Sequence, residues 1–125
     1  MRNSIRRLPD SELEVMQAVW RCTPPVSRAD IEAIMQKTRP MAQTTLLTLL
    51  SRLAEKGFLQ VEKNGRSSVY TPLVQRHDYL SSQSKRFVDK LCSGSISAFA
   101  AALCDSGLTR EELAELRALL DRSES

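Results

Sequence analysis

The alternation of apolar and polar positions is most regular between residues 42 and 56. Leucines recur there at i, i+3, i+4 and i+7, a spacing that gathers side chains on one face of a helix. They are Leu46, Leu49, Leu50 and Leu53. The other side carries Ser51, Arg52 and threonines at 44, 45 and 48. Threonines are unusual there, because threonine is a poor helix former and charged residues are the usual choice on a solvated face. The pattern predicts a helix with one face in a core and the other available to a partner.

A β-hairpin is expected directly after this helix. Gly57 can end the helix, and residues 59–63 and 67–71 have the composition of two short strands joined across Asn64-Gly65. Lys63 and Arg66 lie beside this turn, so the hairpin has a basic tip.

Two further helices are expected upstream. The first runs from about residue 10 to residue 21. Its main apolar side consists of Leu13, Met16 and Trp20, with Val15 and Val19 partly on another side. In the second, Ser27 has the features of an N-cap with Asp30 at the third helical position, and residues 38–40 end the segment. Two helices separated by a tight turn and followed by a hairpin form a winged helix-turn-helix.

The second half of the chain predicts three short amphipathic helices. They cover about residues 76–91, a segment around 96–103, and a helix that begins with a capping box of Thr109 and Glu112 and ends at residue 120 or 121. Three such helices in about 50 residues cannot bury their apolar faces well alone, which favours burial against a second copy of the chain. The positions expected in this dimer interface are Leu80, Phe87, Leu91, Ile96, Phe99, Leu103, Leu113, Leu116 and Leu120.

The predicted fold class is therefore mainly α with a small β-hairpin wing. We expect a winged helix-turn-helix DNA-binding domain over residues 1–73 and a helical dimerisation domain over residues 74–125. Charge agrees with this division: residues 1–75 hold 11 Lys and Arg against 7 Asp and Glu, whereas residues 76–125 hold 7 against 8. The modest positive excess lies in the half that would face phosphates.

Other classes of protein find little support in the composition. No stretch approaches the roughly 18 apolar residues of a membrane span, and no apolar run follows the first residues as in a signal peptide, so we expect a cytoplasmic protein without membrane insertion. Cys22, Cys92 and Cys104 lack the spacing of a zinc site or a disulfide framework, and reduced, mostly buried thiols are expected. His77 is the only histidine, and no nucleophile elbow or phosphate loop is present. We expect no enzyme activity, no metal and no cofactor.

The order and spacing of several short segments resemble the penicillinase-repressor family, which includes the BlaI, MecI and CopY repressors. The segments are residues 13–16 with Val19-Trp20, residues 44–53, Lys56-Gly57, Gly65-Arg66, residues 70–73, residues 76–87 and residues 113–117. The resemblance spans nearly the whole chain. It implies a homodimeric bacterial repressor of transcription that binds a dyad operator and is released by an inducing signal, as in a β-lactam-resistance-like or stress-response operon.

On this basis a double-stranded DNA operator is the expected partner. The expected DNA-binding residues are Gln43, Thr44, Thr45, Thr48, Arg52, Lys63 and Arg66. Arg52 could instead pair with Glu55 or Glu62, and Leu47, at the flank of the helix, could contact a thymine methyl group or thicken the core.

The inducing signal stays open at this stage. In the β-lactam-responsive members of the resembling family, a cut at an Asn-Phe bond inactivates the repressor, and a membrane sensor-protease is a candidate partner. The corresponding positions here are Ala101 and Ala102, so the chain departs from the family's Asn-Phe cleavage sequence. The copper-responsive members carry paired CxC motifs, which this chain lacks.

Two alternative functions are also open. The winged helix could be a protein-interaction module that does not bind DNA, because the fold alone does not fix function. The protein could also be a thiol-responsive regulator switched through Cys92 or Cys104.

Overall fold

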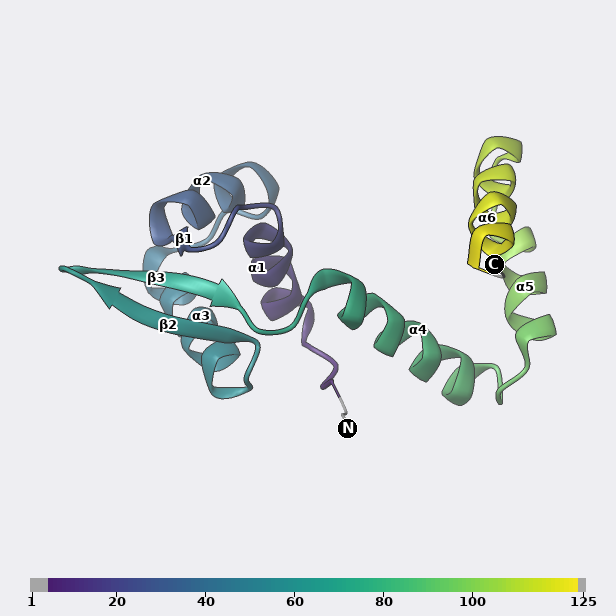
Figure 1. The fold of residues 1–125 in the computed structure, drawn as a ribbon, viewed down its shortest axis with the longest axis horizontal. Helices are drawn as coiled ribbons and strands as arrows, with labels where there is room; N and C mark the ends of the chain where they lie inside the picture. Colours follow the sequence, from purple (N-terminus) through teal and green to yellow (C-terminus); the bar gives the residue numbers. More distant parts are fainter. Residues whose placement is uncertain (1–4, 124–125) are drawn as a thin grey trace. The chain divides into compact units, whose positions relative to one another are not determined.

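The computed structural model describes residues 5–123, and these form two compact units with the division between Gln83 and Ser84. The expected fold class is confirmed: the described chain is mostly helical, with a small antiparallel sheet (Figure 1). The elements of the first unit are α1 (Asp10–Trp20), β1 (Val26–Ser27), α2 (Arg28–Thr38), α3 (Gln43–Glu55), β2 (Leu59–Asn64) and β3 (Ser67–Pro72). The helix α4 (Arg76–Leu91) begins in this unit and ends in the second, which also contains α5 (Ile96–Asp105) and α6 (Arg110–Ser123).

The core of the first unit is built on the leucine face of α3. Leu46, Leu49, Leu50 and Leu53 are all buried, as the spacing predicted. The face of α1 that meets them differs from the expected one: Val15, Met16 and Val19 are fully buried, whereas Leu13 and Trp20 pack only at the edge of the core. The i, i+3, i+4, i+7 series of α1 begins at Glu12, so the buried stripe is rotated relative to the one that Leu13 and Trp20 suggested.

Glu12 carries a charge in this buried stripe. The residue is 3% exposed, and its carboxylate accepts a hydrogen bond from the Lys56 ammonium at 2.5 Å. A buried carboxylate is costly unless it is paired, so this ion pair satisfies Glu12 and ties α1 to the end of α3.

The sheet contains a strand that the sequence did not predict. Val26 pairs with Tyr70 and Ser27 with Val69, which places the short strand β1 beside β3 and gives the order β1-β3-β2. Ser27 then caps α2, where its hydroxyl accepts a hydrogen bond from the Asp30 N–H at 3.1 Å, as expected. One residue therefore ends the strand and begins the helix, which fixes the start of α2 against the hairpin.

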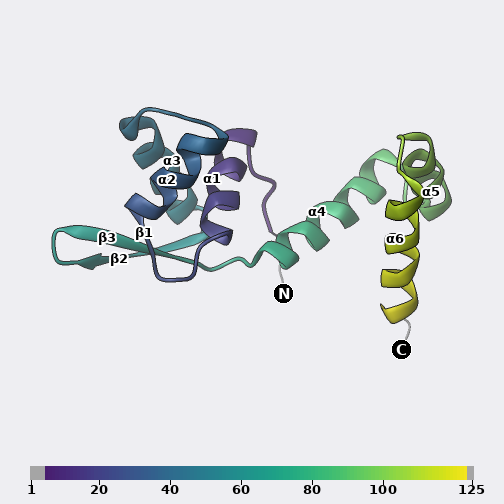
Figure 2. The ribbon, with the colours of Figure 1, turned by 90° about the horizontal axis from the view of Figure 1, so that it is seen from above.

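The hairpin forms the expected wing, but its turn lies one residue later than predicted. Figures 1 and 2 show β2 and β3 extending past the helices of their unit. Asn64 pairs with Ser67, so Gly65 and Arg66 are the two loop residues, and Asn64 belongs to the strand. Gly65 has φ +70° and occupies the first central position, where the type II′ turns that suit two-residue hairpins need a glycine.

An aromatic cluster holds the beginning of α4 against the first unit. The ring centroids of Trp20 and Phe58 lie 5.8 and 5.9 Å from that of Tyr79. The Tyr79 hydroxyl accepts a hydrogen bond from the Leu8 N–H, and the Trp20 indole N–H donates to the Val74 carbonyl, both at 2.9 Å. The connection between β3 and α4 is thus a packed corner. This explains why the compact unit extends to Gln83, beyond the domain boundary expected at residues 73 and 74.

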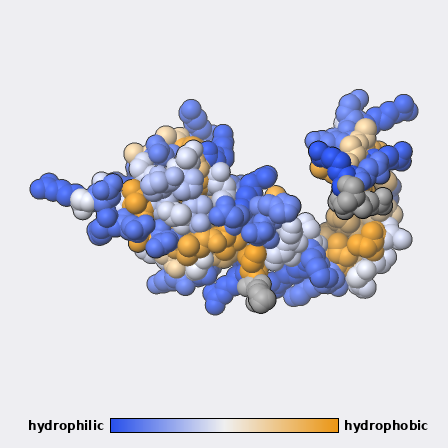
Figure 3. Space-filling model, viewed as in Figure 1, coloured by the Kyte–Doolittle hydropathy of each residue, from blue (hydrophilic) through white to orange (hydrophobic). Residues whose placement is uncertain are grey.

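The second unit leaves much of its apolar surface uncovered. Helix α6 begins with the predicted capping box, in which the Glu112 N–H donates to the Thr109 hydroxyl and the Thr109 N–H donates to the Glu112 carboxylate. Phe87 and Phe99 pack edge to face with centroids 5.8 Å apart. No described residue of α5 is buried, and Figure 3 shows apolar surface over this unit.

Replacing Tyr79 with Phe tests the anchoring of α4. The Tyr79→Phe variant leaves the Leu8 N–H without its acceptor at a buried position, and we expect it to lower the free energy of unfolding by about 1–3 kcal/mol. Urea unfolding followed by circular dichroism measures the change. Tyr70→Phe is the matched control, because Tyr70 is equally buried but its hydroxyl makes no hydrogen bond with any described residue, and a loss of equal size in both variants would contradict the assigned role.

Candidate nucleic-acid interface

The leucine face of α3 determines which residues face outward. Successive residues of a helix are about 100° apart, so Thr44, Thr48 and Ser51 lie opposite the buried leucines. Leu47 falls on one flank of this outer face, and Gln43, seven residues before Leu50, lies at the edge of the leucine face in the first turn. Thr45 and Arg52 fall on the other flank. All seven side chains are exposed, so every predicted contact residue of this helix is accessible.

The threonines differ in what they can offer to a partner. The Thr48 hydroxyl donates to the Thr44 carbonyl at 3.0 Å, one turn earlier in the helix. Its proton is therefore engaged with the backbone, and Thr48 presents a methyl group and an acceptor oxygen outward. Methyl groups of this kind suit the C5-methyl group of thymine.

Arg52 is available for an external contact. Its guanidinium makes no hydrogen bond or ion pair with any described residue. Within residues 5–123, the alternative pairing of Arg52 with Glu55 or Glu62 is therefore not formed. Glu62 lies on the face of the hairpin opposite to that of Lys63, because side chains alternate along a strand.

A groove lies between the start of α2, the Leu47 flank of α3 and the wing. It has a volume of about 300 Å³. Lys63 and Ser68 are paired across the hairpin, and both line this groove together with Arg66. The strand pairing thus brings both predicted wing residues to the side of the unit that also carries Leu47. At 36% exposure, Leu47 forms part of the groove wall and does not thicken the core.

Arg28 also lines this groove and was missed from the sequence; the groove's described lining further includes one acidic residue, Glu32. Arg28 is the first residue of α2 and lines the groove opposite the wing, 3.8 Å from its own-helix neighbour Glu32 in a weak, exposed pair. The signal was present: a cation directly after the N-cap Ser27 is unusual, since a helix N-terminus attracts negative charge. A phosphate placed there would be attracted by Arg28, Lys63, Arg66 and the N-terminus of α2 together.

The predicted dimer residues are only partly gathered in one place. Within the second unit, a groove of about 610 Å³ is lined by five of them. These five are Ile96, Phe99, Leu103, Leu116 and Leu120. Leu91 is 72% exposed and lies outside the groove lining, and Leu80 belongs to the first unit. Leu119, 48% exposed on α6, is a further apolar residue that the spacing did not single out.

The cysteines are less buried than expected. Cys104 is exposed, and Cys22 and Cys92 are half-buried. For Cys92 and Cys104 the reason is that α5 and the end of α4 lack a covering element within their unit. The Cys22 thiol donates to the Ala18 carbonyl at 3.5 Å, and burial, followed by the carboxylate of Asp30, raises the pKa of Cys22. Within residues 5–123, no group of three or more His, Cys, Asp or Glu side chains could hold a metal ion. Within the same residues, no single helix is long and apolar enough to cross a membrane.

The fold and this surface define a winged helix-turn-helix protein with a basic groove and an exposed polar helix. The sequence profile of the penicillinase repressor family matches residues 8–122, so the chain belongs to this family. The penicillinase repressor of Bacillus licheniformis is 30% identical over 94% of this chain and 91% of that protein. The methicillin resistance regulatory protein MecI of Staphylococcus aureus is 28% identical over 98% and 99%.

Two solved structures each match about three fifths of the chain. The Bacillus licheniformis BlaI monomeric form, solved in complex with the blaP half-operator, has a TM-score of 0.51 and 36% identity over 61% of this chain and 92% of that one. The DNA-binding domain of the repressor BlaI has a TM-score of 0.53 and 35% identity over 62% and 94%. The recognised family and the winged-helix fold are thereby confirmed.

The raised pKa of Cys22 predicts slow alkylation of this thiol. In a variant with Cys92→Ser and Cys104→Ser, iodoacetamide should modify Cys22 with a pH midpoint above that of the same variant unfolded in urea, because the thiolate is the reacting form. Mass spectrometry of timed, quenched samples gives both midpoints. Equal midpoints in the folded and unfolded protein would refute the stated environment of Cys22.

Proposed function

We propose that the protein is a homodimeric, sequence-specific repressor of transcription that binds a dyad operator in double-stranded DNA. One observation carries the proposal: the exposed polar face of α3 adjoins a groove lined by Arg28, Lys63 and Arg66. The half-operator complex of the Bacillus licheniformis relative supports the same use of the first unit.

In this proposal α3 lies in the major groove and supplies the specificity. Thr44 and Thr48 face the base edges, Gln43 extends toward them from the first turn of the helix, and Thr45 and Arg52 reach a guanine edge or a neighbouring phosphate. Leu47 offers apolar surface to a thymine methyl group at the wall of the cationic groove. Lys63 and Arg66 of the wing, together with Arg28 of α2, hold the phosphate backbone and so set the register of the helix.

The second unit would join two copies of the chain. Several apolar side chains of this unit remain well exposed, among them Phe87, Leu91 and Ile96, and a second copy would bury them. A dimer then presents two copies of α3 to successive major grooves about 34 Å apart, which matches a dyad operator. Cleavage near Ala101 and Ala102 remains the proposed route of induction, and both side chains are exposed on α5. A membrane sensor-protease would then be the partner that ends repression.

Removal of Arg52 tests the DNA-binding assignment. We expect Arg52→Ala to weaken binding to the operator by about 1–3 kcal/mol, because one bidentate contact is lost, without affecting folding or dimerisation. Arg28→Ala and Arg66→Ala should weaken binding to all DNA sequences and lower the salt slope by about one each, since each removes a phosphate contact. Fluorescence anisotropy on DNA from upstream of the protein's own gene and on scrambled DNA, over a salt series, measures both effects.

Arg110→Ala is the matched control for this series, because Arg110 is exposed at the start of α6 and lies outside the proposed interface. Unchanged operator affinity in Arg52→Ala would remove Arg52 from the interface. Absence of DNA binding even at low salt would favour the protein-interaction module, and operator affinity that depends on thiol oxidation would favour the thiol-responsive regulator.

A charge in the apolar groove of the second unit should prevent dimerisation. We expect Phe99→Asp and Leu116→Asp to convert a species of about twice the chain mass of 14.0 kDa into one of that mass, because a buried unpaired charge is costly. Light scattering after size-exclusion chromatography gives the masses. Ser97→Asp places the same charge at an exposed site of α5 outside the groove lining and should remain dimeric; a dimer in all three variants would contradict the assigned interface.

A further inference from the structure

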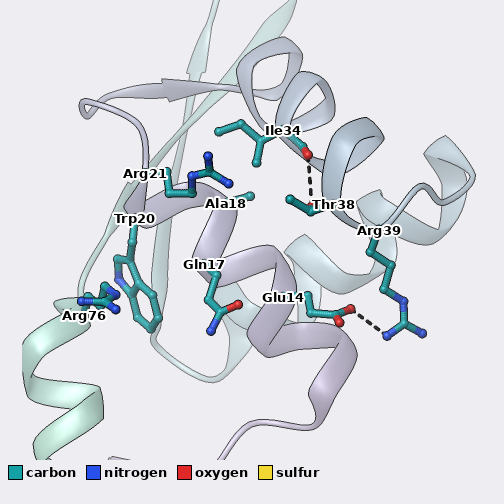
Figure 4. A pocket seen from close by; sticks show the side chains of 9 residues that line it. All are labelled: Glu14, Gln17, Ala18, Trp20, Arg21, Ile34, Thr38, Arg39 and Arg76. Carbon is teal, nitrogen blue, oxygen red and sulfur yellow. Dashed lines mark hydrogen bonds and ion pairs between the residues drawn. The ribbon is translucent and has the colours of Figure 1, made fainter. Parts of the chain in front are cut away.

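A second hollow of the first unit lies between α1 and α2 and has no part in the proposed DNA interface (Figure 4). Its volume is about 540 Å³, within the range of small-molecule sites in proteins. The walls come from both helices, and Arg76 at the start of α4 lies beside Trp20 at one end (Figure 4). We refer to it as the α1–α2 groove.

The apolar part of the α1–α2 groove consists of Ala18, Ile34 and Trp20. Ala18 is buried, and the other two side chains are half-buried and packed at the edge of the core. The Trp20 indole N–H is already engaged with the Val74 carbonyl, so the ring is held in place and offers its apolar surface to the groove. Thr38 is satisfied in the same way, since its hydroxyl donates to the Ile34 carbonyl at 3.0 Å.

The charged part of the lining is strongly unbalanced. Arg21, Arg39 and Arg76 line the α1–α2 groove, and Glu14 is the only acidic residue among its described lining. Arg39 donates to the Glu14 carboxylate at 2.7 Å, as the dashed line in Figure 4 marks. Neither Arg21 nor Arg76 has a hydrogen bond or ion pair with any described residue. In Figure 4, Arg21 and Arg76 lie toward the Trp20 end of the hollow and Arg39 lies with Glu14 at the other end. An excess of cations around a partly apolar hollow favours an anionic ligand.

We propose that the α1–α2 groove binds a small organic anion, with its carboxylate held by Arg39, its charge further attracted by Arg21 and Arg76, and an aromatic or branched body packed on Trp20 and Ile34. A planar guanidinium can hold a carboxylate through two parallel hydrogen bonds. The apolar part of the groove distinguishes this ligand from an inorganic anion, which would leave Trp20 and Ile34 uncovered.

Such a ligand would act on the segment that leads into α3. Arg39 directly follows α2, where its backbone N–H donates to the Met35 carbonyl at 2.8 Å, and its side chain ties this position to Glu14 of α1. A ligand carboxylate competes with Glu14 for Arg39 and so alters the tie between α1 and the turn before α3. The ligand thereby weakens operator binding; this regulatory step rests on the proposed function, whereas the binding site itself does not.

The protein carries its own reporter for this site, because Trp20 is the single tryptophan of the chain. The experiment titrates the full chain, without DNA, with 3-iodobenzoate, whose iodine quenches indole fluorescence. The neutral isostere 3-iodobenzamide is titrated in parallel. We expect saturable quenching by the anion and at least about tenfold weaker binding of the amide. Quenching that rises linearly with concentration and is equal for both compounds would overturn the proposal.

Variants distinguish the groove from general attraction to a basic protein. Arg21→Gln combined with Arg76→Gln should weaken 3-iodobenzoate binding about tenfold, while Lys37→Gln combined with Arg6→Gln removes the same charge outside the groove lining and should leave it unchanged. Glu14→Gln should strengthen binding severalfold, because the competing carboxylate is gone. Equal weakening in both double variants, or no strengthening in Glu14→Gln, would contradict the site.

The link to DNA is measured separately, by operator anisotropy with and without saturating 3-iodobenzoate. Weaker operator binding in its presence supports the coupling, and by reciprocity the operator must then weaken binding of the anion by the same factor. Failure of DNA binding itself would leave the fluorescence result intact, so the two proposals fail independently. Saturable anion binding with unchanged operator affinity would overturn the regulatory step.

Discussion

Burial of the leucine face of α3 is the constraint on which the first unit depends. Full burial of one leucine side chain contributes about 1.5–3 kcal/mol, so the four leucines together resist any rotation of the helix about its axis. A turn of one residue would expose part of this face and bring Thr44 or Ser51 toward the core. The same apolar contacts that stabilise the unit therefore set which side chains of α3 point outward, and the function proposed for the protein is a consequence of its packing.

The second unit shows the opposite relation between apolar surface and packing. Its helices have the right spacing and a complete capping box, yet they leave Ile96 67% exposed and no described residue of α5 buried. Local signals are sufficient to form these helices, but a chain segment of this size cannot supply the cover that they need. An incomplete core of this kind explains why such a protein would act as a dimer, since the partner would finish the fold as well as double the DNA contact.

Features that depend on neighbours in the sequence could be predicted, and those that depend on distant segments could not. The leucine spacing of α3, the Ser27 cap and the reciprocal bonds of Thr109 and Glu112 follow local rules, and the structure confirms them. The two-residue strand β1 carries no pattern of its own and exists because Val26 meets Tyr70, far along the chain. The packing of Trp20 on Tyr79 also could not be predicted from local sequence. Because of this contact the first unit includes the beginning of α4 and ends later in the chain than expected.

The predicted DNA-binding residues also differ in whether their positions follow from local sequence or from distant contacts. Periodicity was enough to place the polar side of α3 opposite the core. The wall of the cationic groove could not be predicted, because it depends on the strand register that pairs Lys63 with Ser68 and on the position of Arg28, which follows strand β1. The engagement of the Thr48 hydroxyl with the Thr44 carbonyl also depends on the side-chain rotamer, which no sequence pattern specifies. The roles of all the predicted DNA-binding residues remain predictions.

Selection of preferred DNA from a random pool tests the central claim most directly. The wild-type protein should select a dyad sequence. Thr48→Asn or Leu47→Asn should select a different base at symmetric positions of the same dyad, because in this account the side chains of α3 contact the bases. Arg66→Ala should retain the wild-type sequence and bind it more weakly, because the wing contacts phosphates. If the α3 variants select the wild-type sequence unchanged, or if no sequence is enriched, the outer face of α3 does not read DNA.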